Sequence, residues 1–236
     1  MGMTKIFINR TTLSIALAPA MTIPFISSLF YFVILGEHAT SRFVYGGAKL
    51  FTLVWPVLCI FLLFRTGFPN LNLRSKKHTR ALPLGLFSGI LIVTAMLFLM
   101  KTPVGGVVID GAENIRKKTE QLGVMDHYWH FSIALSILHS LLEEYYWRWF
   151  VYGSLRKLFG VLTAIVLAGI FFAAHHLVVL TQFFSLQWAF FFSSAVAIGG
   201  MIWSLMFEKQ QTLMGAWISH MLVDFGIFII GYQVLY

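Results

Sequence analysis

The hydrophobic residues of this chain fall in long continuous blocks, not in the alternating pattern of a half-buried strand. Each block holds about 20 residues, the length that an α-helix needs to cross the hydrocarbon core of a bilayer. In lipid, backbone N–H and C=O groups must be satisfied within the protein, so only helices and closed β-barrels span a membrane. Barrel strands are shorter, at about 10 residues, and alternate in polarity. The pattern therefore predicts an all-α, polytopic transmembrane helical bundle.

We place seven spans in a single transmembrane domain over residues 1–236, with eight spans as the alternative. Pro19 and Pro24 lie inside the first span, so we expect a kink or a break there. Between the third and fourth spans, the stretch from Ala112 to Leu122 has the composition of a surface helix. The predicted spans cover about 11–36, 43–64, 81–100, 128–150, 161–181, 185–207 and 212–235.

The composition agrees with a membrane protein: 58% of the residues are hydrophobic and 11% are charged, with a mean hydropathy of +0.81. A soluble domain carries about 25% charged residues. The net charge of +8 does not indicate a nucleic-acid partner, because the basic residues lie mainly in short loops between spans. Cys59 is the only cysteine and lies in an apolar block, which excludes an intramolecular disulfide and predicts a core residue.

The distribution of Lys and Arg predicts the orientation. If the basic connection 65–80 is cytoplasmic, eleven of the 17 basic residues lie on that side. Cytoplasmic loops are enriched in Lys and Arg, so we expect a cytoplasmic N-terminus and, with seven spans, an external C-terminus. The expected location is the plasma (inner) membrane. The eleven residues are Lys5, Arg10, Arg65, Arg74, Lys76, Lys77, Arg80, Arg148, Arg156, Lys157 and Lys209.

Ionisable residues within apolar blocks are the candidates for chemistry, because each costs about 2.5–3.5 kcal/mol at a helix centre on insertion scales. The fourth span contains four of them in HSLLEEYYWRWF. Glu144 and Arg148 are spaced for an ion pair along one face. Glu143 points about 100° away and shares its face with His139. Glu143 is therefore a candidate general base. A structural ion pair at the membrane interface is the competing interpretation.

Histidines and an aspartate mark two further spans. His175 and His176 are adjacent in the fifth span. Because adjacent helical positions diverge by about 100°, we expect only one of them to face a shared cavity. His220 and Asp224 lie four residues apart in the seventh span and can form a hydrogen bond. A self-contained structural pair is the alternative interpretation of this third cluster.

Together the three clusters supply a base, a proton carrier and groups that stabilise an oxyanion, which are the parts needed to hydrolyse an amide. The same carboxylate and imidazole groups are also ordinary ligands of zinc. The sequence contains neither HExxH nor GxSxG, so the familiar signatures of zinc proteases and serine hydrolases are absent.

These clusters resemble the three motifs of the CAAX protease and bacteriocin-processing (CPBP, or Abi) family of intramembrane proteases. The motifs are EExxxR, FxxxH, and a His followed four residues later by Asn or Asp. They correspond to Glu143 through Arg148, Phe172 through His176, and His220 with Asp224. A shifted match of Phe171 to His175 is the second choice for the second motif. The resemblance covers the catalytic half, about 128–235, while the N-terminal spans are similar in hydropathy only.

The resemblance implies a cytoplasm-facing cavity in which Glu143 and His176 activate a water. It also implies that His220 and Asp224 stabilise the oxyanion. An ionised carboxylate cannot donate a hydrogen bond, so Asp224 would have to be protonated or would instead orient His220. We expect no metal cofactor, with zinc as the alternative. The supporting residues are Glu144, Arg148, Phe172, His175 and His139.

The leading hypothesis is an intramembrane endopeptidase acting on a membrane-associated or lipidated peptide. One alternative is a non-enzymatic membrane protein of the same fold, such as a bacteriocin-immunity or assembly factor, but such a protein would have little need for Glu143. Another is a proton-coupled transporter. We find no paired halves with matching broken segments, which disfavours a transporter.

Overall fold

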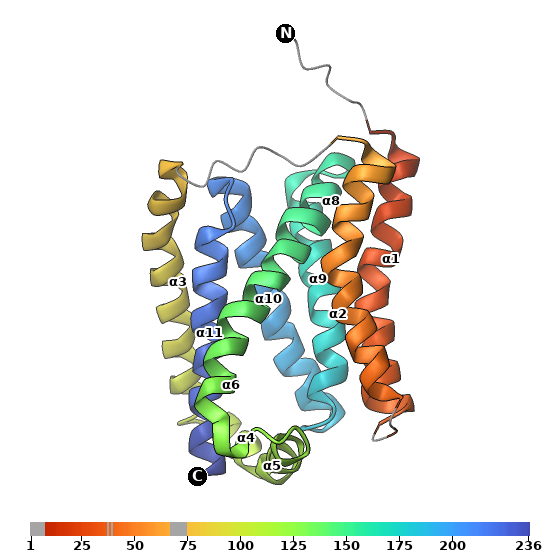
Figure 1. The fold of residues 1–236 in the computed structure, drawn as a ribbon. Helices are drawn as coiled ribbons and strands as arrows, with labels where there is room; N and C mark the ends of the chain where they lie inside the picture. Colours follow the sequence, from red (N-terminus) through yellow and green to blue (C-terminus); the bar gives the residue numbers. More distant parts are fainter. Residues whose placement is uncertain (1–7, 37, 39, 67–74) are drawn as a thin grey trace.

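The computed structural model describes residues 8–36, 38, 40–66 and 75–236, and this part of the chain forms helices and no strand (Figure 1). The α-helices are α1 (Arg10–Ser28), α2 (Ser41–Leu58), α3 (Lys76–Leu99), α4 (Pro103–Asp110), α5 (Ala112–Gln121), α6 (Tyr128–Ala134), α7 (Ser140–Glu143), α8 (Gly153–Leu158), α9 (Val161–Leu180), α10 (Leu186–Gln210) and α11 (Met214–Leu235). The π-helical segments are Leu29–Ile34, Cys59–Phe64, Leu135–His139 and Glu144–Tyr152, and a 3₁₀ turn covers Met125–His127. The predicted all-α bundle is confirmed.

Six helices in the described ranges are long and apolar enough to cross a membrane, and they match six of the seven predicted spans. The remaining prediction, 128–150, falls within the helical segments between Tyr128 and Leu158, called the α6–α8 helix below. This helix is more polar than the others because it contains Glu143, Glu144 and Arg148. The six candidate spans are Arg10–Ile34, Ser41–Phe64, Lys76–Leu99, Val161–Leu180, Leu186–Gln210 and Met214–Leu235.

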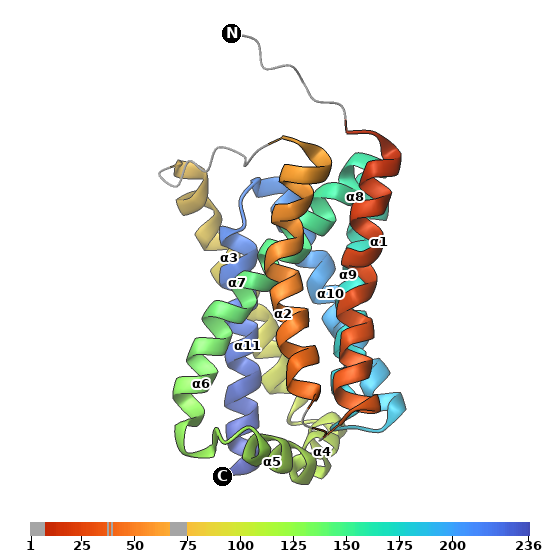
Figure 2. The same ribbon diagram turned by 45° about the vertical axis from the view of Figure 1, so that its right-hand side comes forward.

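Two further predictions, a kink or break in the first span and a surface helix after the third, have different outcomes. Of the kink or break expected at Pro19 and Pro24, the break is absent, because α1 runs through both prolines and continues into the π-helical segment Leu29–Ile34. The predicted surface helix is confirmed as α5, which lies with α4 across one end of the bundle (Figures 1 and 2). With Tyr128–Leu158 added to the six candidate spans, the described helices alternate in direction.

α1 begins at one end of the bundle, and the C-terminus of the chain lies at the opposite end (Figure 1). Most of the basic residues used to predict the orientation cluster at the end where α1 and α3 begin and α8 and α10 finish. Lys5 and Arg74 lie outside the described residues. Arg148 differs from the prediction, because its side chain is buried among helices and does not belong to a basic loop. The excess of basic residues at this end of the bundle comes from the other residues of that set.

The core that supports the site joins α1, the π-helical segment Cys59–Phe64, the α6–α8 helix, α9, α10 and α11. Cys59 is fully buried there as a free thiol, as predicted. Two aromatic side chains cross this core and satisfy their polar atoms on α1: the Tyr146 hydroxyl donates to the carbonyl of Ala20, and Trp55 Nε1 donates to that of Ala16. These bonds attach the N-terminal helices to the helix that carries the two glutamates.

Small residues allow the closest helix contacts. A Cβ built on Gly85 of α3 would lie 2.6 Å from the carbonyl oxygen of Gly215 in α11, so the two backbones touch. A Cβ on Gly169 of α9 would lie 2.8 Å from the carbonyl oxygen of Ala197 in α10. In lipid, helices associate through such packing because no hydrophobic driving force acts between them. These crossings hold α9 and α11, which carry the site histidines, in fixed positions.

We expect Gly85→Ala to lower the free energy of unfolding by about 1–3 kcal/mol, because the added methyl group meets backbone that has no room to move. Gly46→Ala is the matched control, since a Cβ on Gly46 would have nothing within 4 Å. Unfolding of both variants in detergent measures the difference. Equal stability of the two variants would show that α3 and α11 do not pack as closely as described.

Candidate active site

The site is centred on α7, which lies between the two ends of the bundle (Figure 2). This short helix is flanked by the π-helical segments Leu135–His139 and Glu144–Tyr152. Wide π-helical turns are rare and are frequently found at functional sites. They change the angular spacing of the side chains along the α6–α8 helix, and both glutamates lie at the junction of α7 with the second segment.

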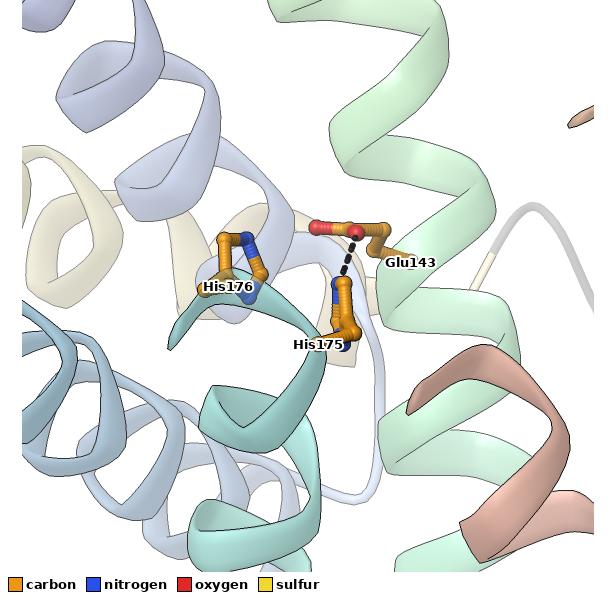
Figure 3. A group of neighbouring side chains, drawn as sticks. All are labelled: Glu143, His175 and His176. Atoms are coloured by element: carbon orange, nitrogen blue, oxygen red, sulfur yellow. Dashed lines mark ion pairs between the residues drawn. The ribbon is translucent and has the colours of Figure 1, made fainter. Parts of the chain in front are cut away.

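Glu143 is surrounded by imidazoles from three helices. His139 Nε2 and His175 Nε2 lie 3.3 Å and 3.4 Å from its Oε1 atom, and His220 Nε2 lies 3.6 Å from Oε2. Figure 3 shows the carboxylate extending towards the two adjacent imidazoles of α9. Glu143 is only 7% exposed, so these contacts replace most of its hydration. The three sequence clusters therefore meet at one carboxylate.

Glu144 has a different set of partners. Its Oε1 atom lies 3.2 Å from Arg148 Nη1 and accepts a 2.8 Å hydrogen bond from His220 Nδ1. Glu144 and Arg148 are 0% and 1% exposed, so the predicted ion pair is buried and does not belong to an interfacial belt. The guanidinium also lies over the ring of Phe172, with Cζ 4.4 Å from the ring centroid.

His175 and His176 both lie beside Glu143, contrary to the expectation that only one would. Their ring centroids are 4.0 Å apart, and one nitrogen of each ring lies within 4.8 Å of a Glu143 carboxylate oxygen. His176 Nδ1 donates to the backbone carbonyl of Phe172 at 2.9 Å. In the neutral ring, its Nε2 atom then keeps a lone pair. His175 makes the closer contact with Glu143, and which histidine takes part in chemistry stays a prediction.

His220 is oriented by Glu144, whereas the sequence offered Asp224 as one possible orienting residue. Asp224 Oδ1 lies 3.5 Å from Nε2 of His220, while Nδ1 is bound to Glu144. The Glu144 contact therefore fixes the tautomer of the imidazole. Trp203 of α10 stacks on the same ring at 4.0 Å between centroids. Asp224 is thus available to act beside Nε2, on the side of the ring that faces Glu143.

Two residues of the site are missing from the sequence prediction. Lys49 Nζ lies 3.1 Å from His139 Nδ1, and Trp203 supports His220. Lys49 could have been found, because it is an ionisable residue inside an apolar block, the same signal that marked the other clusters. Trp203 carries no such signal, since an aromatic residue within a span is indistinguishable from a packing residue.

Glu143, His175 and His176 also form a set of ligands that fits a metal ion. Their ligand atoms all lie within 4.8 Å of one another. Catalytic zinc sites commonly use three protein ligands of these types and keep a fourth position for water. The arrangement is therefore suited to general acid–base chemistry and also compatible with zinc.

Comparison with known proteins agrees with the family resemblance. The family described as Type II CAAX prenyl endopeptidase Rce1-like matches residues 126–226, a range that contains all three clusters. Neither the curated proteins nor the solved structures gave a match. The matched range covers the α6–α8 helix, α9, α10 and the part of α11 that carries His220 and Asp224. This C-terminal region is therefore similar to the type II CAAX prenyl endopeptidase family, which supports the resemblance to the CAAX protease and bacteriocin-processing family of membrane proteases.

Proposed function

We propose that the protein is an intramembrane endopeptidase that hydrolyses a peptide bond in a membrane-associated or lipidated peptide. The observation that carries the proposal is the buried carboxylate of Glu143 with imidazoles from three helices around it. Such a group differs from a structural ion pair, because its neighbours can all exchange protons. The pair of Glu144 and Arg148 already fills the structural role.

In the proposed mechanism, a water binds between Glu143 and Nε2 of His176. Glu143 takes a proton from the water while its oxygen attacks the peptide carbonyl carbon. The carbonyl oxygen becomes an oxyanion, which is stabilised by His220 and a protonated Asp224. The C–N bond then breaks, and the proton held by Glu143 passes to the leaving amine. Burial of the site strengthens each of these electrostatic contacts.

We propose that this reaction proceeds without a metal. A bound zinc ion would be held by Glu143, His175 and His176 and would supply a polarised water. In the metal-free mechanism these same residues act directly on the water. The charge asymmetry of the bundle supports a cytoplasmic location for the N-terminal end, with the site accessible from that side.

Cleavage assays on the protein reconstituted in bilayers test the proposal. The substrates are membrane-anchored peptides with and without an isoprenoid group, and mass spectrometry detects the fragments. We expect new fragments from at least one peptide, at a rate that a strong zinc chelator leaves within about twofold of the untreated rate. Inhibition by the chelator that added zinc reverses would contradict the metal-free mechanism. A complete lack of cleavage would count against the endopeptidase.

The role of Asp224 is tested by two substitutions. Because Glu144 already orients His220, we expect Asp224→Asn, which provides a permanent donor, to keep kcat within about threefold of the wild-type value. Asp224→Leu should lower kcat about 10²-fold, as expected for the loss of one oxyanion donor. A large loss in Asp224→Asn as well would indicate that an ionised carboxylate is required at this position.

A further inference from the structure

Lys49 is a basic residue near the middle of α2, in the stretch 43–64 that contains no other charged residue. It lies in α2, within the candidate span Ser41–Phe64, and outside the range that matches the protease family. α2 packs beside the π-helical segment that begins at Glu144. An ionisable side chain within a span needs a partner, and such residues commonly have a function.

The partner of Lys49 is a histidine of the site. Its Nζ atom lies 3.1 Å from Nδ1 of His139, and Nε2 of the same ring lies 3.3 Å from Oε1 of Glu143. Among the described residues, no carboxylate forms an ion pair with Lys49. Its other close neighbour is the Tyr45 ring, whose centroid is 5.5 Å from Nζ. The amine therefore reaches the site through one imidazole.

The directions of these hydrogen bonds follow from the groups involved. An ammonium group has three donors and no acceptor, so Lys49 must donate to His139. Nδ1 of His139 is then the acceptor, and the proton of the neutral ring lies on Nε2. That N–H points at the Glu143 carboxylate, which accepts. Lys49, His139 and Glu143 thus form a chain in which each group fixes the orientation of the next.

We infer that Lys49 is a positioning residue of the proposed peptidase: it holds His139 in the tautomer that donates to Glu143. This inference rests on the proposed function, because Glu143 is the general base there. This chain of hydrogen bonds places the His139 N–H against Oε1 of Glu143 and fixes the rotamer of the carboxylate. The carboxylate then meets the attacking water in one geometry. Lys49 itself does not touch the substrate or the water.

Kinetics of a double-mutant cycle test the inference. Lys49→Met keeps the length of the side chain and removes its donors, while Lys49→Arg keeps a cationic donor. We expect Lys49→Met to lower kcat about tenfold with KM within about twofold, and Lys49→Arg to recover most of the loss. In a His139→Phe background, Lys49→Met should have no further effect, because the chain is already broken. Additive losses, or an effect confined to KM, would overturn the inference.

A spectroscopic measurement tests the same point without activity. The protein contains eight histidines, and the ¹⁵N signals of His139 in bilayers are identified by their absence in His139→Phe. We expect an unprotonated Nδ1 and a protonated Nε2 in the wild type, and a change of this pattern in Lys49→Met. An identical pattern in Lys49→Met would overturn the inference. If the wild type cleaves no peptide, the proposed function fails, while this spectroscopic test still decides whether Lys49 holds His139 in one tautomer.

Discussion

Glu143→Gln should abolish peptide cleavage, with a fall in kcat of about 10³-fold or more. The substitution keeps the shape of the side chain and removes its ability to take a proton, and a positioned general base contributes about 10²–10⁴-fold. His139, His175 and His220 remain in place but lose the carboxylate that they surround. The rate of fragment formation in bilayers measures the effect.

The control for this variant is Glu113→Gln. Glu113 lies on the surface helix α5, where its side chain is 70% exposed and pairs with Lys117. The same change of charge at that position should leave kcat unaltered. The melting temperatures of both variants must stay near that of the wild type, so that a loss of cleavage is not a loss of fold. Full activity of Glu143→Gln would remove this residue from the mechanism.

Arg148→Met should destabilise the fold by about 3–5 kcal/mol, because it leaves the buried Glu144 carboxylate without its cationic partner. Glu144 is fully buried, so water cannot replace the lost ion pair. The remaining contact from His220 Nδ1 compensates only in part. Unfolding in detergent gives the change in free energy. Adding Glu144→Gln to Arg148→Met should recover part of the loss, since the uncompensated charge is then removed.

The matched control is Arg156→Met, which breaks the ion pair of Arg156 with Glu208. The side chains of that pair are 30% and 26% exposed, so solvent screens their attraction. Partly exposed ion pairs contribute little to stability, so Arg156→Met should destabilise the fold much less than Arg148→Met. If Arg148→Met and Arg156→Met destabilise equally, burial of the Glu144 pair is not what makes it important.

Contacts within one helix were predicted well, because a helix places residues four apart on the same face. His139 with Glu143, Glu144 with Arg148, and His220 with Asp224 all lie close together, as the spacing indicates. The apolar blocks likewise predicted six of the spans, since their length is fixed by the thickness of a bilayer.

Contacts between helices were predicted less well, because they depend on crossing geometry and side-chain torsions that spacing does not contain. The bond from His220 to Glu144 joins residues far apart in the chain. α3 and α11 approach each other closely at Gly85 and Gly215, and the sequence does not show that these two glycines face each other. The absence of Lys49 from the predicted site does not have this cause. Lys49 is an ionisable residue inside an apolar block, so the signal that marked the histidines applies to it as well.

The most direct measurement is mass spectrometry of a membrane-anchored peptide incubated in ¹⁸O-labelled water with the reconstituted wild type and Glu143→Gln side by side. The mechanism predicts two fragments from the wild type, with one ¹⁸O atom in the new carboxylate, and neither fragment above background from Glu143→Gln. Equal amounts of labelled fragments from both proteins would contradict the assignment of Glu143 as the base that activates water.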